Sequence, residues 1–130
     1  MNRLGNVIYY VKDVAKTVDF FEKAFGLERQ FIDEKGIYAQ MKTGETALGF
    51  AQEEFAKTLV PSGFSPLSPA KPFGQEISFC SKDPKSAYAL AIENGCKEIS
   101  PLRAKEWGQT VGHVLTPEGI LVEIASEMGA

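Results

Sequence analysis

Three side chains in the second half of the chain could carry chemistry, namely Glu76, His113 and Glu123. His113 is the only histidine, and it lies ten residues before Glu123 in a segment that predicts a β-hairpin. An imidazole beside carboxylates can act as an acid, a base or a metal ligand, because histidine titrates close to neutral pH. A lone histidine in a strand can equally be a packed or surface residue, and a strand Glu can simply pair with a nearby Lys. Both interpretations stay open at this point.

The turn of this hairpin decides whether His113 and Glu123 share one face of the sheet. If Thr116-Pro117-Glu118-Gly119 is counted as a four-residue loop, Gly112 pairs with Glu123 and His113 faces away. A bulge at Gly119 would shift the pairing by one residue and turn His113 to the same face as Glu123. The sequence leaves both registers open.

Glu76 and Glu123 raise a question of charge if they face one pocket. Two unpaired carboxylates cannot both be ionised there without a cost in free energy. One Glu could hold a proton, a metal ion or a cationic ligand could lie between them, or Lys105 or Arg103 could fold in from the preceding loop. A bound cation would suit a pocket for basic or cationic compounds.

Two aromatic residues are candidates for contact with a small-molecule ligand. Tyr10 lies in a predicted strand, and Trp107 comes directly before Gly108 at the opening of another. An aromatic ring offers a large apolar contact area to an amphipathic ligand. We therefore predict Tyr10 and Trp107 as ligand contacts, whereas Phe50 and Phe79 are predicted to belong to the core.

The elements that must position these residues occur twice in the chain. Residues 7–26 and residues 77–95 each contain a short apolar strand, an Asp and an amphipathic stretch that ends at Gly. Asp13 and Asp83 can cap these helices by accepting the free N–H groups of the first turn. The repetition predicts a pseudo-symmetric domain, and such domains commonly hold their site between the two copies.

Each helix is accompanied by four predicted strands. The first half contains strands Asn6–Val11, Leu27–Asp33, Ile37–Lys42 and Thr46–Gln52, and the second half contains strands Gln75–Ser81, Lys97–Leu102, Gln109–Leu115 and Ile120–Ser126. Residues 53–60 could form a short helix, and the four Pro and two Gly of residues 61–74 predict an irregular segment. We expect a single domain of residues 1–130, with modules of about 4–52 and 75–127 and a linker of 53–74 that acts as a connector or a lid.

The composition of the chain indicates which partners and which cellular location to expect. The 130 residues carry a net charge of −3, which argues against nucleic acid and anionic membranes as partners because both favour basic surfaces. No apolar run is long enough to span a membrane, and the N-terminal MNRLGN has no apolar signal region. Cys80 and Cys96 are more consistent with reduced thiols than with a disulfide, so we predict a cytoplasmic protein.

Three segments resemble a known family, namely VKDVAKTVDFFEKAFGL, SKDPKSAYALAIENGC and WGQTVGHVLTPEGILVEI. In this order and spacing the chain resembles the vicinal oxygen chelate superfamily, which includes glyoxalase I, extradiol dioxygenases and bleomycin-resistance proteins. The resemblance covers essentially the whole chain. It implies an α+β fold in which two βαβββ modules form a curved mixed sheet with an open cup, and it implies a homodimer.

The resemblance also implies where a metal would bind in this fold. Metal-dependent members take one ligand from the first strand and one from the last strand of each module, and these positions fall on Asn6, Gly49, Glu76 and Glu123. Glu123 matches the family pattern and Glu76 is a carboxylate, but Asn6 is a weak donor and Gly49 has no side chain. Because zinc, nickel and iron prefer imidazole nitrogen among their ligands, we expect no cofactor, with a divalent metal on Glu76 and Glu123 as the alternative.

We therefore favour a small-molecule binding protein of the glyoxalase/bleomycin-resistance type, which sequesters a hydrophobic or cationic compound in the cup without a complete metal site. The residues predicted to line it are Asn6, Tyr10, Glu76, Trp107, His113 and Glu123. The alternative is a glyoxalase-like lyase or isomerase, or an extradiol-type dioxygenase, with His113 and Glu123 as catalytic residues and Glu76 as a further metal ligand. A third interpretation is an interaction domain without a small ligand.

Overall fold

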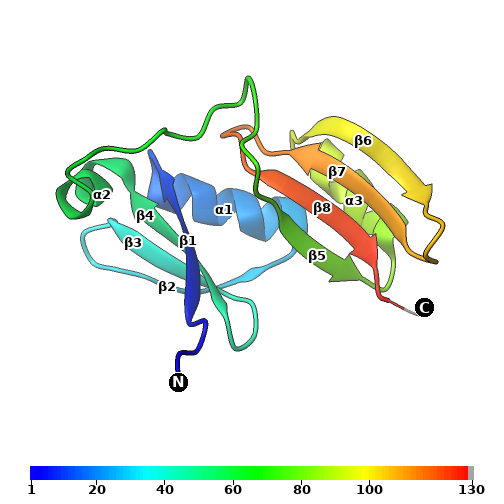
Figure 1. The fold of residues 1–130 in the computed structure, drawn as a ribbon, viewed down its shortest axis with the longest axis horizontal. Helices are drawn as coiled ribbons and strands as arrows, with labels where there is room; N and C mark the ends of the chain where they lie inside the picture. Colours follow the sequence, from blue (N-terminus) through cyan, green and yellow to red (C-terminus); the bar gives the residue numbers. More distant parts are fainter. Residues whose placement is uncertain (129–130) are drawn as a thin grey trace. The chain divides into compact units, whose positions relative to one another are not determined.

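The computed structural model describes residues 1–128, which divide into two compact units between Pro66 and Leu67. The first unit contains β1 (Asn6–Val11), α1 (Val14–Phe25), β2 (Glu28–Ile32), β3 (Tyr38–Lys42), β4 (Ala47–Gln52) and α2 (Glu53–Leu59). The second contains β5 (Ile77–Ser81), α3 (Pro84–Glu93), β6 (Lys97–Ala104), β7 (Thr110–Leu115) and β8 (Leu121–Ser126) (Figure 1). The division falls within the segment predicted as the linker.

Each unit builds its own four-stranded mixed sheet. The strand order is β1-β4-β3-β2 in the first and β5-β8-β7-β6 in the second. The first strand of each module runs parallel to the last, β1 beside β4 and β5 beside β8, and the remaining neighbours are antiparallel. The predicted α+β class with two βαβββ modules is confirmed.

Helix α1 covers one face of the first sheet. Asp13 Oδ1 accepts a hydrogen bond of 3.0 Å from the backbone N–H of Lys16, and Gly26 ends the helix with a φ of 67°. The helix buries Phe21 completely against Phe50 of β4, with ring centroids 4.9 Å apart. This packing covers one side of the sheet and leaves the other side for different contacts.

Helix α3 covers one face of the second sheet in the same way. Its N-cap Asp83 accepts a hydrogen bond of 3.1 Å from the backbone N–H of Ser86. Gly112 of β7 lies beneath the helix, since a Cβ atom there would lie 2.9 Å from Leu102 Cα and 3.0 Å from Tyr88 Cε2. Because successive strand residues point to opposite faces, the side chain of His113 lies on the face away from α3.

The turn between β7 and β8 settles the register that the sequence left open. The N–H of Thr116 donates to the carbonyl of Ile120 and the N–H of Gly119 donates to the carbonyl of Thr116, both at 2.9 Å. With Gly119 at a φ of 106°, this is a three-residue hairpin loop that ends in a glycine bulge. His113 consequently pairs with Glu123, so the register counted from a four-residue loop is wrong and the bulged alternative is confirmed.

Strand β6 is longer than the pattern predicts. It continues past Pro101 to Ala104, and its pairing with β7 shifts between Ser100 and Arg103, which accommodates a residue that has no N–H to donate. Cys80 is exposed, whereas burial raises the pKa of the Cys96 thiol to about 12. Among the described residues, no helix is both long enough and apolar enough to cross a bilayer.

Candidate functional site

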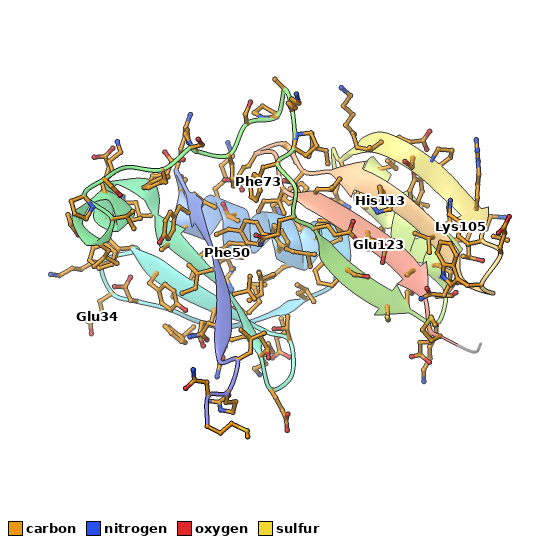
Figure 2. The ribbon with its side chains drawn as sticks, in the orientation of Figure 1. Glu34, Phe50, Phe73, Lys105, His113 and Glu123 are labelled. Carbon is orange, nitrogen blue, oxygen red and sulfur yellow. The ribbon has the colours of Figure 1, made fainter. Side chains whose placement is uncertain are left out.

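The second sheet brings Glu76, His113 and Glu123 together on the face away from α3. His113 on β7 lies opposite Glu123 on β8, and Glu123 in turn lies beside Ser78 on β5. Glu76 precedes Ser78 by two residues and therefore projects from the same side of the chain. Figure 2 shows His113 and Glu123 on these neighbouring strands. We refer to Glu76, His113 and Glu123 as the triad.

The donor atoms of the triad are close to one another. His113 Nε2 lies 3.1 Å from Glu76 Oε1 and 3.6 Å from Glu123 Oε2. One nitrogen and two carboxylate oxygen atoms, one from each residue, all lie within 4.8 Å of one another. The side chains retain 39%, 25% and 22% exposure for Glu76, His113 and Glu123, so solvent or a small molecule can reach the cluster.

Ser78 holds one oxygen of Glu123 in place. Its hydroxyl donates to Glu123 Oε1 at 2.5 Å, while the other oxygen, Oε2, is the one that faces His113. The hydrogen bond fixes the orientation of the carboxylate in the way that residues behind metal ligands commonly do. We did not predict Ser78, although its period-two spacing from Glu76 could have placed it on this face.

The triad has the donor set and the spacing of a divalent metal site. Metal–ligand distances of 2.0–2.2 Å place adjacent ligands of one ion roughly 3 Å apart. The two contacts of His113, at 3.1 Å and 3.6 Å, are close to that separation. One imidazole with two carboxylates is a set that divalent transition metals accept, and it leaves coordination positions open for other ligands. The residues therefore fit such an ion.

The remaining predicted residues have contacts within their own units. Asn6 and Tyr10 belong to the first unit, where Asn6 accepts a hydrogen bond from Gln40 and the ring of Tyr10 packs on Phe64 at 4.8 Å. Trp107, in the turn between β6 and β7, is 61% exposed and donates from Nε1 to Gln109. Their roles as ligand contacts stay predictions.

The positive side chains considered for the triad do not pair with it. Within residues 1–128, neither Lys105 nor Arg103 forms an ion pair with Glu76 or Glu123, and Lys105 lies toward one end of the sheet (Figure 2). His113 is thus the single basic side chain in contact with the two carboxylates in the described part of the chain.

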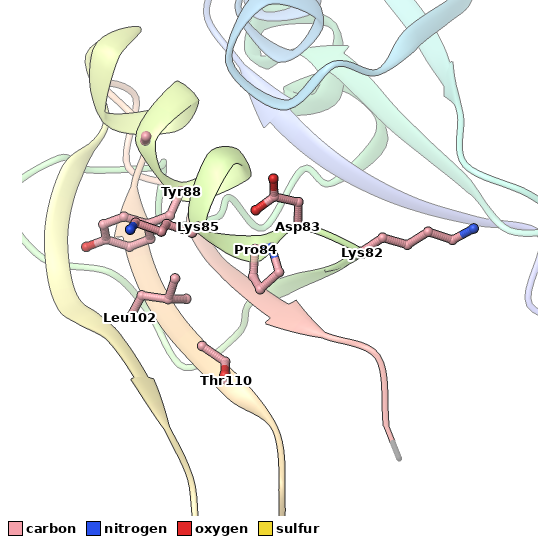
Figure 3. Close-up of a pocket in the computed structure, with 8 residues that line it drawn as sticks. Lys82, Asp83, Pro84, Lys85, Tyr88, Leu102 and Thr110 are labelled. Atoms are coloured by element: carbon pink, nitrogen blue, oxygen red, sulfur yellow. The ribbon is translucent and has the colours of Figure 1, made fainter. Parts of the chain in front are cut away.

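A cavity of about 600 Å³ lies on the other side of the second sheet, between α3, β6 and β7. Tyr88, Leu102 and Thr110 line it (Figure 3). The Tyr88 hydroxyl donates to Glu98, and burial with this contact raises the pKa of the phenol. The cavity contains no member of the triad, so the two features are separate.

Comparison with known proteins places these features in a family context. Residues 3–124 match the family profile described as the Glyoxalase/Bleomycin resistance protein/Dioxygenase superfamily. The chain is 28% identical over 123 residues to YraH of Bacillus subtilis (strain 168), a protein described as uncharacterized, and the match covers 94% of this chain and 96% of that protein.

Solved structures share the fold at low sequence identity. A glyoxalase-related enzyme from Fulvimarina pelagi gives a TM-score of 0.81 at 15% identity, over 98% of this chain and 89% of that one. A glyoxalase/bleomycin resistance protein/dioxygenase family enzyme from Burkholderia phytofirmans PsJN gives 0.74 at 20% identity, over 96% and 98% of the two chains. At these identities the structures support the fold alone.

Proposed function

Because the chain belongs to the Glyoxalase/Bleomycin resistance protein/Dioxygenase superfamily, we propose that it binds one divalent metal ion through Glu76, His113 and Glu123 and acts as a metal-dependent lyase, isomerase or dioxygenase. The observation that supports this proposal is the convergence of three donor atoms on one open sheet face. The preference for a metal-free site, drawn from the sequence, depended on a missing imidazole, and His113 supplies one from β7.

A divalent ion would also resolve the charge conflict of the two carboxylates. Two ionised Glu side chains close together repel each other, and a doubly positive ion between them balances that charge. When bound, such an ion polarises a carbonyl or hydroxyl oxygen of a ligand and lowers the pKa of bound water. The open face of the triad leaves room for a small oxygen-bearing substrate on the solvent side.

The protein side chains then have distinct tasks. Glu76 and Glu123 supply the charge, His113 supplies the imidazole nitrogen, and Ser78 directs Glu123 Oε2 toward the centre of the triad. The reaction class follows from family analogy, because the same fold carries several chemistries. Superfamily members bind small molecules and often form dimers, and we propose a cytoplasmic homodimer here.

Ser78→Ala is expected to weaken metal binding about tenfold, because Glu123 loses the hydrogen bond that orients it. Competition with a metal-binding dye measures the affinity. Ser100→Ala is the matched control, since Ser100 lies opposite His113 on the other neighbouring strand. Equal affinities for the two variants would contradict the role of Ser78, and Ser78→Thr, which keeps a hydroxyl, is expected to restore most of the binding.

A second function is favoured by the acidity of the same cluster. Among the described residues, His113 is the one basic side chain that pairs with the two carboxylates, so a cationic ligand would be attracted even without a metal. This function, binding of a cationic compound, predicts that protein treated with a chelator binds benzyltrimethylammonium and that Glu76→Gln weakens this binding severalfold. Calorimetry measures both, and heats equal to those of dilution would exclude this function for that class of ligand.

A further inference from the structure

The cavity beside α3 depends on a glycine in the sheet beneath the helix. The pairing of β6 with β7 shifts between Ser100 and Arg103, where three steps along β6 match two along β7. In this stretch Leu102 comes so close to Gly112 of β7 that a Cβ atom on the glycine would lie 2.9 Å from Leu102 Cα. The same atom would lie 3.0 Å from Tyr88 Cε2. The missing side chain therefore lets Leu102 and Tyr88 approach the same point of the sheet, and both line the cavity.

The cavity has the size of a small-molecule site. Its volume of about 600 Å³ lies within the range of roughly 300–1,000 Å³ that such sites occupy in proteins. Every residue that lines it belongs to the second unit. It lies on the α3 side of the second sheet, whereas the His113 side chain of the triad lies on the opposite face. The cavity and the triad therefore use opposite faces of one sheet.

Apolar side chains form part of the cavity wall, namely those of Pro84, Tyr88, Ala89 and Leu102. The Tyr88 hydroxyl donates to Glu98 Oε2 at 2.5 Å, so its hydrogen is already used and the ring is the part of Tyr88 that a ligand can contact. An aromatic ring offers a large contact area to another flat ring, and the aliphatic side chain of Leu102 extends this surface. The wall is therefore suited to a flat apolar group.

Polar groups lie on either side of this apolar wall. In the view of Figure 3, Leu102 lies between Lys85 and Thr110. The side chain of Lys85 extends toward Tyr88, and that of Lys82 extends away from it. Within residues 1–128, neither lysine forms an ion pair, and the Thr110 hydroxyl has no hydrogen-bond partner. An ammonium group and a hydroxyl are thus available to a ligand.

Asp83 is the one carboxylate among the lining residues, and both of its oxygen atoms are engaged. Oδ1 accepts from the N–H of Ser86 at 3.1 Å, and Oδ2 accepts from the Ser86 hydroxyl at 2.7 Å. These hydrogen bonds, that of the hydroxyl above all, hold the pKa of Asp83 below its usual value. Glu98, which accepts from the Tyr88 hydroxyl, does not line the cavity. The lining therefore carries two positive charges and one negative charge, a balance that favours an anion.

We propose that this cavity binds an aromatic monocarboxylate that bears a hydroxyl group at the far end of its ring system. The carboxylate pairs with the ammonium group of Lys85, the rings lie against Tyr88 and Leu102, and the ligand hydroxyl forms a hydrogen bond with Thr110. A few polar groups that orient a ligand beside apolar surface are the usual composition of a small-molecule site. Without a metal, the two carboxylates of the triad would repel the same compound, so the two sites select different ligands.

The probe that tests this site is 6-hydroxy-2-naphthoate, and 2-naphthol is its counterpart without the carboxylate. In ¹⁵N-labelled, chelator-treated protein, we expect 6-hydroxy-2-naphthoate to shift the backbone amide signals of Lys85, Leu102 and Thr110 in a saturable manner, with a Kd below about 1 mM. 2-Naphthol is expected to bind about fivefold more weakly, because it cannot pair with Lys85. The use of metal-free protein prevents the carboxylate from binding to an ion at the triad and separates this result from the proposed metal site.

Lys85→Gln is expected to weaken binding of 6-hydroxy-2-naphthoate about fivefold and to leave binding of 2-naphthol unchanged. Lys97→Gln is the matched control, because Lys97 is an exposed residue of β6 that does not line the cavity, and we expect it to change neither affinity. Thr110→Val, which replaces the hydroxyl by a methyl group, is expected to weaken binding of 6-hydroxy-2-naphthoate about threefold.

Three results would overturn the proposal. The first is that 6-hydroxy-2-naphthoate leaves the signals of Lys85, Leu102 and Thr110 unmoved. The second is that Lys85→Gln and Thr110→Val both bind it as the unchanged protein does. The third is that Lys97→Gln loses as much affinity as Lys85→Gln, since binding would then reflect the general surface charge of the second unit.

Discussion

Replacing Glu123 by Gln is expected to weaken divalent metal binding at least about 100-fold, which corresponds to about 2.7 kcal/mol of binding free energy. Glutamine keeps the length of the side chain and can still accept the hydrogen bond from Ser78. It removes the negative charge and offers only a neutral amide at the position of Glu123 Oε2, which lies 3.6 Å from His113 Nε2. The loss therefore measures the charge of one ligand, with little change in packing.

Titration of the chelator-treated protein with Mn²⁺ and Zn²⁺, followed by calorimetry or dye competition, measures the affinity. Glu106→Gln is the matched control, because Glu106 is an exposed carboxylate in the turn between β6 and β7 of the same unit. We expect this variant to bind as the unchanged protein does. If Glu123→Gln and Glu106→Gln lost affinity equally, binding would reflect general surface charge and the triad would not be the site.

Replacing Gly119 by Ala is expected to destabilise the second unit by about 3 kcal/mol. Gly119 has a φ of 106°, where an L side chain is strained. A Cβ atom there would also lie 2.3 Å from the carbonyl oxygen of Ser68 and 2.9 Å from its nitrogen. These are backbone atoms, so no side-chain rotation relieves the clash and the chain itself must shift.

Gly108→Ala separates the two causes of this loss. Gly108 has a similar φ of 95° but no atom within 4 Å of the added Cβ, so it carries the conformational cost without the clash. We expect about 1 kcal/mol for Gly108→Ala. Urea unfolding measures both variants, and equal losses would show that the contact with Ser68 is unimportant. Since Gly119 also sets the pairing of His113 with Glu123, Gly119→Ala is expected to weaken metal binding as well.

Local signals in the sequence predict the elements of this fold well. Asp13 before an apolar stripe and Gly26 after it are sufficient to bound α1, because a side-chain cap and a left-handed residue act within one turn of helix. The repeat of the same signals around α3 predicts the second module. The end of strand β6 is less predictable, since its continuation past Leu102 to Ala104 follows a register shift against β7.

The candidate site is harder to predict because it depends on register. A one-residue shift at Gly119 decides whether His113 meets Glu123, and the sequence is compatible with both arrangements. The family pattern also places metal ligands on the first and last strands of each module, whereas His113 lies on β7. The family pattern alone therefore finds no imidazole, but the structure places that of His113 on β7, next to β8.

In the first unit, too, the sequence alone does not predict which side chains meet on the sheet. Sequence comparison with the family pattern marks Gly49 as a position without a ligand, but it gives no sign that the Tyr38 hydroxyl fills this space. Gln40 reads as an ordinary polar strand residue. Its contacts with Asn6 and Tyr38 appear only when β1 and β3 are placed on either side of β4.

Metal content of the purified, untagged protein tests the proposed function most directly. The protein is incubated separately with Mn²⁺, Ni²⁺ and Zn²⁺, freed of unbound ions by gel filtration and analysed by mass spectrometry. We expect about one ion per chain for at least one of these metals, held by the triad of Glu76, His113 and Glu123. Retention of none of the three would contradict the metal site and leave binding of a cationic compound as the better-supported function.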